Sequence, residues 1–478
     1  MKHATCPACV MAMSGALSLV LSAAPVRAQT PPPLPPAPHS WVVPVSPVGR
    51  FSEPGIAVDP NDPMHVVVTY QGPATVAYST DGGKTFTRAS GTASTRYSGS
   101  GDVSITYDSR GHAILCYIAL DSLGTSQYWG HDATANGIYV RRSLDGGKTW
   151  ETDDIAVWDH TTRPGVQIPF EDKPYIVADN NPESPFYGNL YVGWTQDRLT
   201  DSGIIFSRST DGGKTWSKPI QISRSSLPRD DNGMTEGFDG TVTPDGVLHT
   251  IWAGQYDELR YASSDDGGKT FRPSRAIVET GPSRFHILGF PSRNGVNGYP
   301  QISMVPGEDG EAAHLYATWS DYRNGEVDVF AVHSDDEGVT WSEPVKVNTD
   351  PAHDGADHFL QWMAADPKTG DLFVSFFDRR ADPTGTTAQF VLARSTDGGK
   401  AFDNWTWSTA PFNTMNVVLG DYTGLTAFGG CVYGVWAETR KPSADHASST
   451  HGSEPYRYPP TQVVVGGASF KSTGTCTR

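Results

Sequence analysis

Residues 209–216 read Ser209-Thr210-Asp211-Gly212-Gly213-Lys214-Thr215-Trp216, and close copies of this stretch return five more times along the chain. Each copy follows the pattern Ser-x-Asp-x-Gly-x-Thr-Trp/Phe, except that Ala401 replaces the threonine in the last one. The other copies cover residues 79–86, 143–150, 264–271, 334–341 and 395–402. Their aspartates lie about 55 to 70 residues apart, and this regular spacing indicates an internal repeat.

The octapeptide has the composition of a hairpin connection between two strands. An apolar, β-rich run such as residues 203–207 precedes it, and an extended segment such as residues 218–222 follows it. The aspartate can accept hydrogen bonds from backbone N–H groups of the turn, and glycine supplies the positive φ that such a turn needs. The final Trp or Phe gives this polar turn an apolar anchor. The repeat therefore predicts a structural role first.

The pattern closely resembles the Asp box, or bacterial neuraminidase repeat, of sialidases and related β-propellers. The resemblance implies an all-β propeller of four-stranded antiparallel blades, in which each of six boxes joins the third and fourth strands. It also implies that the boxes lie on the face away from the active site and are not catalytic.

Seven units of similar length account for roughly residues 41–470, so we expect a single seven-bladed propeller domain over residues 41–478. The seventh unit begins near Gly420 and has no box. We expect residues 41–45 to supply its missing fourth strand, because this pairing would leave the ring without an open edge. A six-bladed ring, as in sialidases proper, is the alternative.

The N-terminal residues predict export. Residues 1–28 have Lys2, an apolar stretch from Val10 to Ala24, and the small-residue pattern Val26-Arg27-Ala28, which together are typical of a secretory signal peptide. Residues 29–40 are proline-rich and predict an extended linker. No later stretch is long and apolar enough to span a bilayer. We therefore expect a secreted or periplasmic monomer.

Charge and cysteine content narrow the function further. The net charge of −17 disfavours nucleic acid and anionic membranes as partners. Cys6 and Cys9 lie in the predicted signal peptide, which leaves Cys116, Cys431 and Cys476. Cys116 lies in an apolar run and reads as a buried residue, whereas the sequence leaves open whether Cys431 and Cys476 form a disulfide. Histidines do not cluster at zinc-ligand spacing, so neither a metal nor a cofactor is expected.

The predicted topology brings two sets of polar side chains to one central opening, because the first strand of a blade starts on the face where the second strand ends. First strands start with Glu53, Asp102, Glu171, Asp172, Glu236, Asp239, Tyr299, His358, Asp421 and Tyr422. Second strands end with Asp197, Arg198, Asp321, Arg323, Asp378, Arg379, Arg380, Glu438 and Arg440. Such a mouth could bind polar sugars. The alternative is structural: acids that bond turn N–H groups, and Asp–Arg pairs that hold the blades together.

The resemblance to sialidases also implies catalytic roles. Taken in chain order, Asp102 corresponds to the general acid/base, Glu236 to the partner of the nucleophile, and Tyr422 to the nucleophile. Arg50, Arg323 and Arg379 correspond to the arginine triad that grips a substrate carboxylate. Arg198 and Arg440 are further candidates for substrate binding. The chain reads Arg50-Phe51-Ser52 where the family has Arg-Ile-Pro.

These observations favour exo-acting hydrolysis of a glycan that carries an acidic sugar. A non-catalytic propeller that binds carbohydrate or protein is the main alternative, because one propeller scaffold hosts unrelated functions. A lyase acting on uronic acids is the third, with Arg284 to neutralise charge, His286 as base and a tyrosine as acid.

Overall fold

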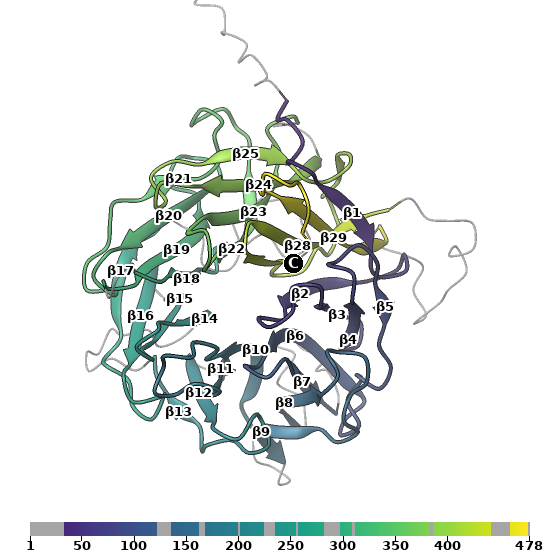
Figure 1. The fold of residues 1–478 in the computed structure, drawn as a ribbon, viewed down its shortest axis with the longest axis vertical. Helices are drawn as coiled ribbons and strands as arrows, with labels where there is room; N and C mark the ends of the chain where they lie inside the picture. The colour runs from purple at the N-terminus through teal and green to yellow at the C-terminus, as the bar shows by residue number, and fades with distance from the viewer. Residues whose placement is uncertain are drawn as a thin grey trace, which may run out of the picture.

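The computed structural model describes residues 33–121, 135–161, 168–198, 201–223, 235–254, 257–281, 297–307, 311–382, 386–440 and 459–476. The predicted signal peptide and the segment with Arg284 and His286 lie outside these residues. The described strands form seven antiparallel sheets arranged as blades around one axis (Figure 1). This confirms the all-β, seven-bladed propeller and excludes the six-bladed alternative.

Each blade is a meander of four strands, numbered outward from the axis. The first blade contains β2 (Ser52–Val58), β3 (Val66–Gln71), β4 (Thr75–Ser79) and β5 (Thr87–Arg88). The second contains β6 (Gly99–Tyr107), β7 (Ala113–Leu120), β8 (Ala135–Ser143) and β9 (Ile155–Thr161). The third contains β10 (Phe170–Ala178), β11 (Leu190–Asp197), β12 (Ser202–Ser209) and β13 (Ile220–Gln221). The fourth contains β14 (Glu236–Val242), β15 (Leu248–Ala253), β16 (Glu258–Ser264) and β17 (Arg275–Glu279).

The remaining blades follow the same plan, except that the sixth has an extra strand and the seventh takes its fourth strand from the N-terminal part of the chain. The fifth contains β18 (Gln301–Val305), β19 (His314–Asp321), β20 (Asp328–Ser334) and β21 (Val345–Lys346). The sixth contains β22 (His358–Ala365), β23 (Leu372–Asp378), β24 (Thr387–Ser395) and β25 (Asp403–Thr406), and β26 (Phe412–Asn413) also pairs with β24. The seventh contains β27 (Gly424–Phe428), β28 (Cys431–Thr439), β29 (Thr461–Ser469) and β1 (Trp41–Pro44).

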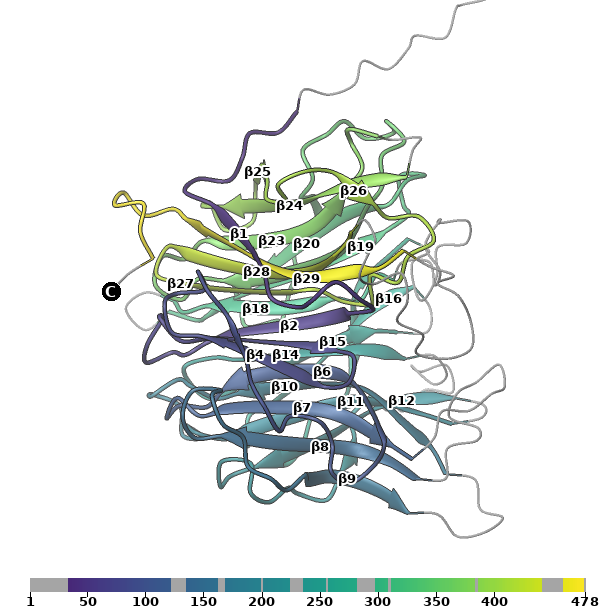
Figure 2. The same cartoon turned by 90° about the vertical axis from the view of Figure 1, so that its right-hand side faces the viewer.

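The two ends of the chain close the ring in the seventh blade. Strand β1 pairs antiparallel with β29, from Trp41 opposite Gly467 to Pro44 opposite Val464, which confirms the predicted fourth strand (Figure 2). A disulfide joins Cys431 to Cys476, so the question that the sequence left open is answered. Just before β1, the backbone of Ala37 donates to Thr406 O at 2.9 Å, so the end of the proline-rich segment lies against the sixth blade.

All six boxes fall in the described part of the chain and join the third and fourth strands of their blades. In the third blade, Ser209 Oγ donates to Asp211 Oδ1 at 2.8 Å, and Thr215 donates to the same carboxylate from its backbone N–H and its hydroxyl. The N–H of Gly213 donates to Ser209 Oγ at 2.9 Å. In the last box Ala401 keeps only the backbone bond to Asp397. These bonds close within five residues, which explains why the turn is recognisable from the sequence alone.

The apolar cores lie between the blades. The buried apolar residues of the described chain form seven clusters, and each joins one face of a blade to the facing side of the next. Trp194, Trp252, Trp319 and Trp436 come from second strands and are fully buried in these clusters. The blades are therefore fixed relative to one another, and residues at their inner ends hold a defined geometry. No helix among the described residues has the length and apolar character needed to cross a membrane.

Candidate functional site

The strand register defines which face of the ring carries the site. Where β2 starts, Ser52 lies opposite Gln71 at the end of β3, and Phe170 at the start of β10 lies opposite Asp197 at the end of β11. The boxes follow the ends of third strands, which run parallel to the first strands, so they lie on the opposite face. The predicted convergence of first-strand starts and second-strand ends is therefore present.

A β-bulge shapes the start of five described inner strands, namely β2, β6, β10, β14 and β22. The first bulge residue has a positive φ in each, with values of 51° for Glu53, 42° for Asp102, 46° for Lys173, 78° for Gly237 and 51° for Leu360. Glycine adopts this region easily, whereas other residues are strained in it. In three successive blades the strained position carries a charged side chain, and strain of this kind often accompanies function.

The side chain of Lys173 lies at the centre of a group of acids. Its Nζ is 3.0 Å from Asp421 Oδ2, 3.2 Å from Glu236 Oε1 and 3.5 Å from Asp172 Oδ2. The Lys173 side chain is only 9% exposed, whereas that of Asp421 is 25% exposed. We call Glu53, Asp102, Asp172, Asp197, Glu236 and Asp421 the carboxylate cluster, because their charges act on one another and on Lys173.

Burial and the neighbouring charges shift the pKa values of the acids in this cluster in different directions. Burial raises the pKa of Asp102 well above its ordinary value, and the charges of Asp172 and Glu53 raise it further. Burial and repulsion by Asp421 raise the pKa of Glu53 to about 7. Although burial opposes ionisation of Asp172, its pKa is lowered by Lys173 and by a hydrogen bond with Asp102. The pKa values of Asp102 and Asp172 are therefore shifted in opposite directions, and such divergence is typical of acid–base sites.

Glu236 pairs with a tyrosine that we did not select from the sequence. The hydroxyl of Tyr299 donates a hydrogen bond to Glu236. Burial raises the pKa of Glu236, and Lys173 partly offsets this rise. Burial and the charge of Glu236 raise the pKa of Tyr299 well above its usual value, so the proton stays on the phenol while the carboxylate is ready to accept it.

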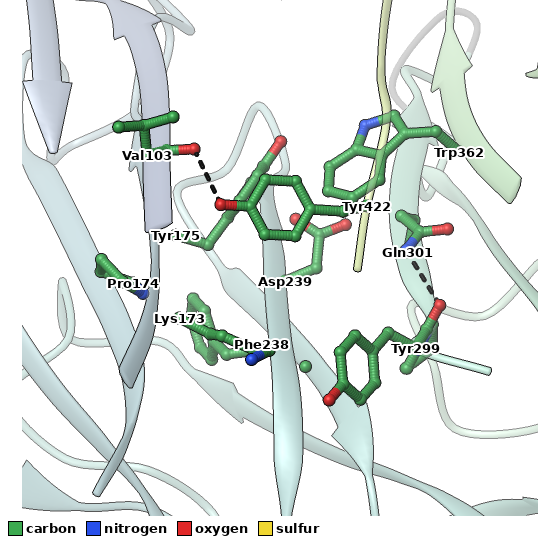
Figure 3. A pocket seen from close by; sticks show the side chains of 12 residues that line it. Val103, Lys173, Pro174, Tyr175, Phe238, Asp239, Tyr299, Gln301, Trp362 and Tyr422 are labelled. Carbon is green, nitrogen blue, oxygen red and sulfur yellow. Dashed lines mark hydrogen bonds between the residues drawn. The ribbon is translucent and has the colours of Figure 1, made fainter. Parts of the chain in front are cut away.

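A cavity in the axial channel lies next to this cluster (Figure 3). It encloses about 420 Å³ of space, open solvent at its mouth included. Its walls include Val103, Lys173, Tyr175, Asp239, Tyr299, Gln301, Trp362 and Tyr422. The ring of Trp362 lies 5.5 Å from that of Tyr175 and 6.3 Å from that of Tyr422, measured between centroids. Aromatic faces beside carboxyl and amide groups form a surface suited to sugars.

The three predicted catalytic residues all reach the axial region but do not form the predicted pairs. Asp102 and Glu236 belong to the carboxylate cluster, and Tyr422 lines the cavity. The hydroxyl of Tyr422 donates to Val103 O at 3.4 Å, whereas Glu236 has Tyr299 as its phenolic partner. Glu236 therefore contacts Tyr299 and not Tyr422, the partner that the sequence had predicted.

The five predicted substrate-binding arginines do not line the axial cavity. Arg198 forms an ion pair with Asp201 at 3.2 Å, and Arg323 forms one with Asp321 at 2.6 Å. Arg379 donates to Thr414 Oγ1 at 2.7 Å, Arg440 contacts Glu438, and Arg50 is exposed just before β2. Three of these arginines thus pair with acids two or three residues away in the same blade, and Arg323 also reaches the neighbouring fourth blade by donating to Glu279 O at 3.1 Å.

A second buried charged group lies between the fifth and sixth blades. Atoms of Asp328, Asp350 and His358 are close enough to hold a metal ion, and none of the three is exposed. Burial alone would lower the pKa of His358, but Asp378 and Asp350 outweigh it and raise the pKa to about 9. Lys346 and Arg380 also contact these acids. Three acids thus face three cations, and this balance favours a structural ion network.

Sequence reasoning placed Tyr299, Asp172 and Asp421 at the opening but did not select them, and it missed Lys173. One signal could have identified Lys173. The bulge residue directly precedes Pro54 in the first blade and Pro174 in the third, so Glu53 and Lys173 occupy equivalent positions. An alignment of the units on this proline would have placed both side chains at the axis.

Comparisons with known proteins agree with the repeat. The family model of the BNR/Asp-box repeat matches residues 207–218, which include the third box. A search of curated proteins finds no match.

Several solved structures are similar to the chain, and three examples each have low sequence identity to it. A protein of unknown function from Dyadobacter fermentans DSM 18053 is 14% identical, with 89% of this chain and 97% of that chain covered and a TM-score of 0.47. The Hadza microbial sialidase Hz136 is 16% identical, with 84% and 73% covered and a TM-score of 0.42. A polysaccharide lyase of family PL25, an ulvan lyase, is 13% identical, with 83% and 93% covered and a TM-score of 0.49.

The matched box, its five copies with closely similar hydrogen bonds, and the ring of seven four-stranded sheets together identify the architecture. The chain is a seven-bladed β-propeller built from BNR/Asp-box repeats.

Proposed function

We propose that the protein acts on glycans at the axial cavity, as a glycoside hydrolase with Tyr299 as nucleophile. The observation that carries this proposal is the contact between Tyr299 and Glu236, beside a cluster in which burial and neighbouring acids raise the pKa of Asp102. A tyrosine activated by a glutamate is a known exception to hydrolysis by two carboxylates. The reaction needs no group beyond the chain's own side chains.

In the first step, Tyr299 Oη forms a bond to the anomeric carbon as the glycosidic C–O bond breaks. Glu236 takes the phenolic proton, and a protonated carboxyl of the cluster, assigned to Asp102, gives its proton to the departing oxygen. In the second step, water attacks the anomeric carbon and loses a proton to the Asp102 carboxylate. The bond from this carbon to Tyr299 Oη breaks as the water attacks, and the phenolate recovers its proton from Glu236.

Lys173 supports this division of roles. Its ammonium contacts Glu236 and Asp172 and favours their ionised forms, whereas burial and the charges of Asp172 and Glu53 raise the pKa of Asp102 and favour its protonated form. An acid and a base are thereby kept available within one site.

Non-catalytic glycan binding is the second candidate. The observation that favours it is that none of Arg50, Arg323 and Arg379, the proposed arginine triad, lines the cavity, and that Arg323 pairs with Asp321 while Arg379 donates to Thr414. The aromatic wall of the cavity would serve binding as well as catalysis.

A panel of nitrophenyl glycosides with neutral, amino and acidic sugars separates the two candidates. We expect the wild type to release nitrophenol from at least one glycoside, and Tyr299→Phe to lower kcat by about 100-fold or more at unchanged melting temperature. Tyr187→Phe is the matched control, because Tyr187 is 49% exposed in the loop between β10 and β11. Saturable binding without turnover of any glycoside would support the binding module. Loss of turnover in Tyr422→Phe but not in Tyr299→Phe would transfer the nucleophile's role to Tyr422.

We also propose that the mature protein is secreted or periplasmic. The Cys431–Cys476 disulfide supports this, because such bonds form and persist in oxidising compartments. Cell fractionation followed by N-terminal sequencing would test it, and an intact leader on cytosolic protein would contradict it.

A further inference from the structure

We propose that the axial site rejects sugars that carry a carboxylate and prefers a sugar that carries a protonated amino group. This inference rests on the proposed function, because it names the substrate class of the same site. It reverses the expectation of an acidic sugar, which followed from the resemblance to sialidases.

The charges around the cavity carry the first step. Asp239 is the one acid and Lys173 the one cation among the described residues that line the cavity, and the six acids of the carboxylate cluster lie directly behind Lys173. The Lys173 ammonium is already within 3.5 Å of three carboxylate oxygens. Even when Glu53, Asp102 and Asp197 hold protons, the three acids that contact Lys173 outnumber this single cation. A negative, weakly solvated site repels an anionic ligand and attracts a cationic one.

Two buried carboxyl oxygens that no N–H or alcohol donor reaches carry the second step. Glu53 Oε2 and Asp102 Oδ2 are buried and accept no hydrogen bond from a backbone N–H, amine or alcohol donor of the described chain, while carboxyl–carboxyl hydrogen bonds link Glu53 to Asp102 and Asp102 to Asp172. The residues that follow them, Pro54 and Val103, line the axial channel. Acceptors buried in this way are normally satisfied, and an ammonium group offers three donors while a carboxylate offers none.

The aromatic wall carries the third step. Figure 3 shows Trp362 on the side of the cavity opposite Lys173 and Tyr299, with Tyr422 between them. Aromatic faces attract cations and also pack against the C–H faces of a sugar ring. A sugar stacked on this wall would direct an amino substituent towards the carboxylate cluster.

Calorimetry of the full chain with matched sugars tests the preference. D-glucosamine, D-glucose and D-glucuronate form one series, their galacto counterparts form the second, and binding is measured near pH 6.5, where an amino group stays protonated. In at least one series we expect the amino sugar to bind about fivefold or more tightly than the neutral one, and the uronate to bind more weakly than either. A uronate that equals or exceeds the neutral sugar would overturn the inference. Failure of all six sugars to bind would overturn it as well.

A charge variant and its control test the cause. Asp421→Asn removes one charge at the most exposed acid that contacts Lys173, and we expect it to reduce the preference for the amino sugar several-fold. Asp265→Asn is the matched control, because Asp265 is 61% exposed in a box on the opposite face. An unchanged preference in Asp421→Asn would contradict the electrostatic explanation.

The binding measurements and the glycoside panel test the two proposals separately, so either proposal can fail while the other stands. If the amino sugar binds but no glycoside is hydrolysed, the substrate class stands and the hydrolase proposal falls. If only acidic glycosides are hydrolysed, the hydrolase proposal stands and the substrate class falls.

Discussion

Replacing Lys173 by methionine should destabilise the propeller to an extent that depends on pH. The methionine fills a similar volume, so the change removes the ammonium while largely keeping the packing. Asp172, Glu236 and Asp421 would then lose the cation that lies within 3.5 Å of each. Breaking a buried ion pair by removing one partner costs about 3 to 5 kcal/mol, because a buried charge is left uncompensated. We expect a loss in this range at about pH 8.

The loss should shrink as the pH falls. In the wild type the pKa of Asp172 is lowered, so this group contributes stability that is present above its unfolded pKa and is lost in acid. In the variant Asp172 and Glu236 keep their burial without the cation, so we expect their folded pKa values to exceed the unfolded ones. A group whose folded pKa is raised makes its full contribution to stability below its unfolded pKa, and this contribution is lost as the pH rises. The two stability curves should therefore converge towards about pH 5.

Thermal unfolding provides the assay. An unfolding entropy of about 2.1 cal/mol/K per residue gives roughly 0.9 kcal/mol/K for a domain of about 430 residues, so the expected loss lowers the Tm by about 3 to 6 °C at high pH. Lys214→Met is the control, because Lys214 is exposed in the third box. Equal Tm values for wild type and Lys173→Met at high pH would refute the account, as would a difference that grows in acid.

Two further predictions concern other parts of the ring. Replacing Cys431 and Cys476 by serine opens a loop with a sequence separation of 45, and the chain-entropy model gives a loss of about 4 kcal/mol. We expect the double variant to have a lower Tm than the wild type without reductant, and an equal Tm in both would count against it. The pKa of His358 is raised to about 9. Its contribution to the stability of the fold is therefore complete below the unfolded pKa near 6.5 and is lost as the pH rises through 9. His358→Gln should remove up to about 3 kcal/mol of stability at neutral pH and flatten the fall of Tm in alkali, and an unchanged slope would argue against this role.

Local chemistry explains how much of the fold was predictable. The box bonds link residues two to four positions apart, as in Ser209, Asp211 and Thr215, so the motif itself contains the whole interaction. Six such motifs at regular spacing, together with one further unit that lacks a box, predicted seven blades, and that seventh unit indicated where β1 would pair. The axial opening followed from the alternation of strand direction.

The sequence did not show in the same way which side chains contact one another at the axis. Lys173 meets Glu236 from the next blade and Asp421 from the seventh, and these contacts depend on how the blades rotate around the axis. Mapping roles by chain order selected Tyr422 for Glu236, yet Tyr299 at the entrance to the fifth blade is the residue that reaches it. Likewise, the arginines of the second strands could have pointed inwards or paired with nearby acids, and several of them pair.

The repeat thus specified the ring, because hydrogen bonds within each box and apolar strands between boxes are properties of short segments. Side chains from different blades meet only after the ring has closed, and their pairing and protonation depend on distances of a few ångströms across the axis. Coulomb energies and desolvation vary steeply over such distances, so the composition of the site was decided by the tertiary structure.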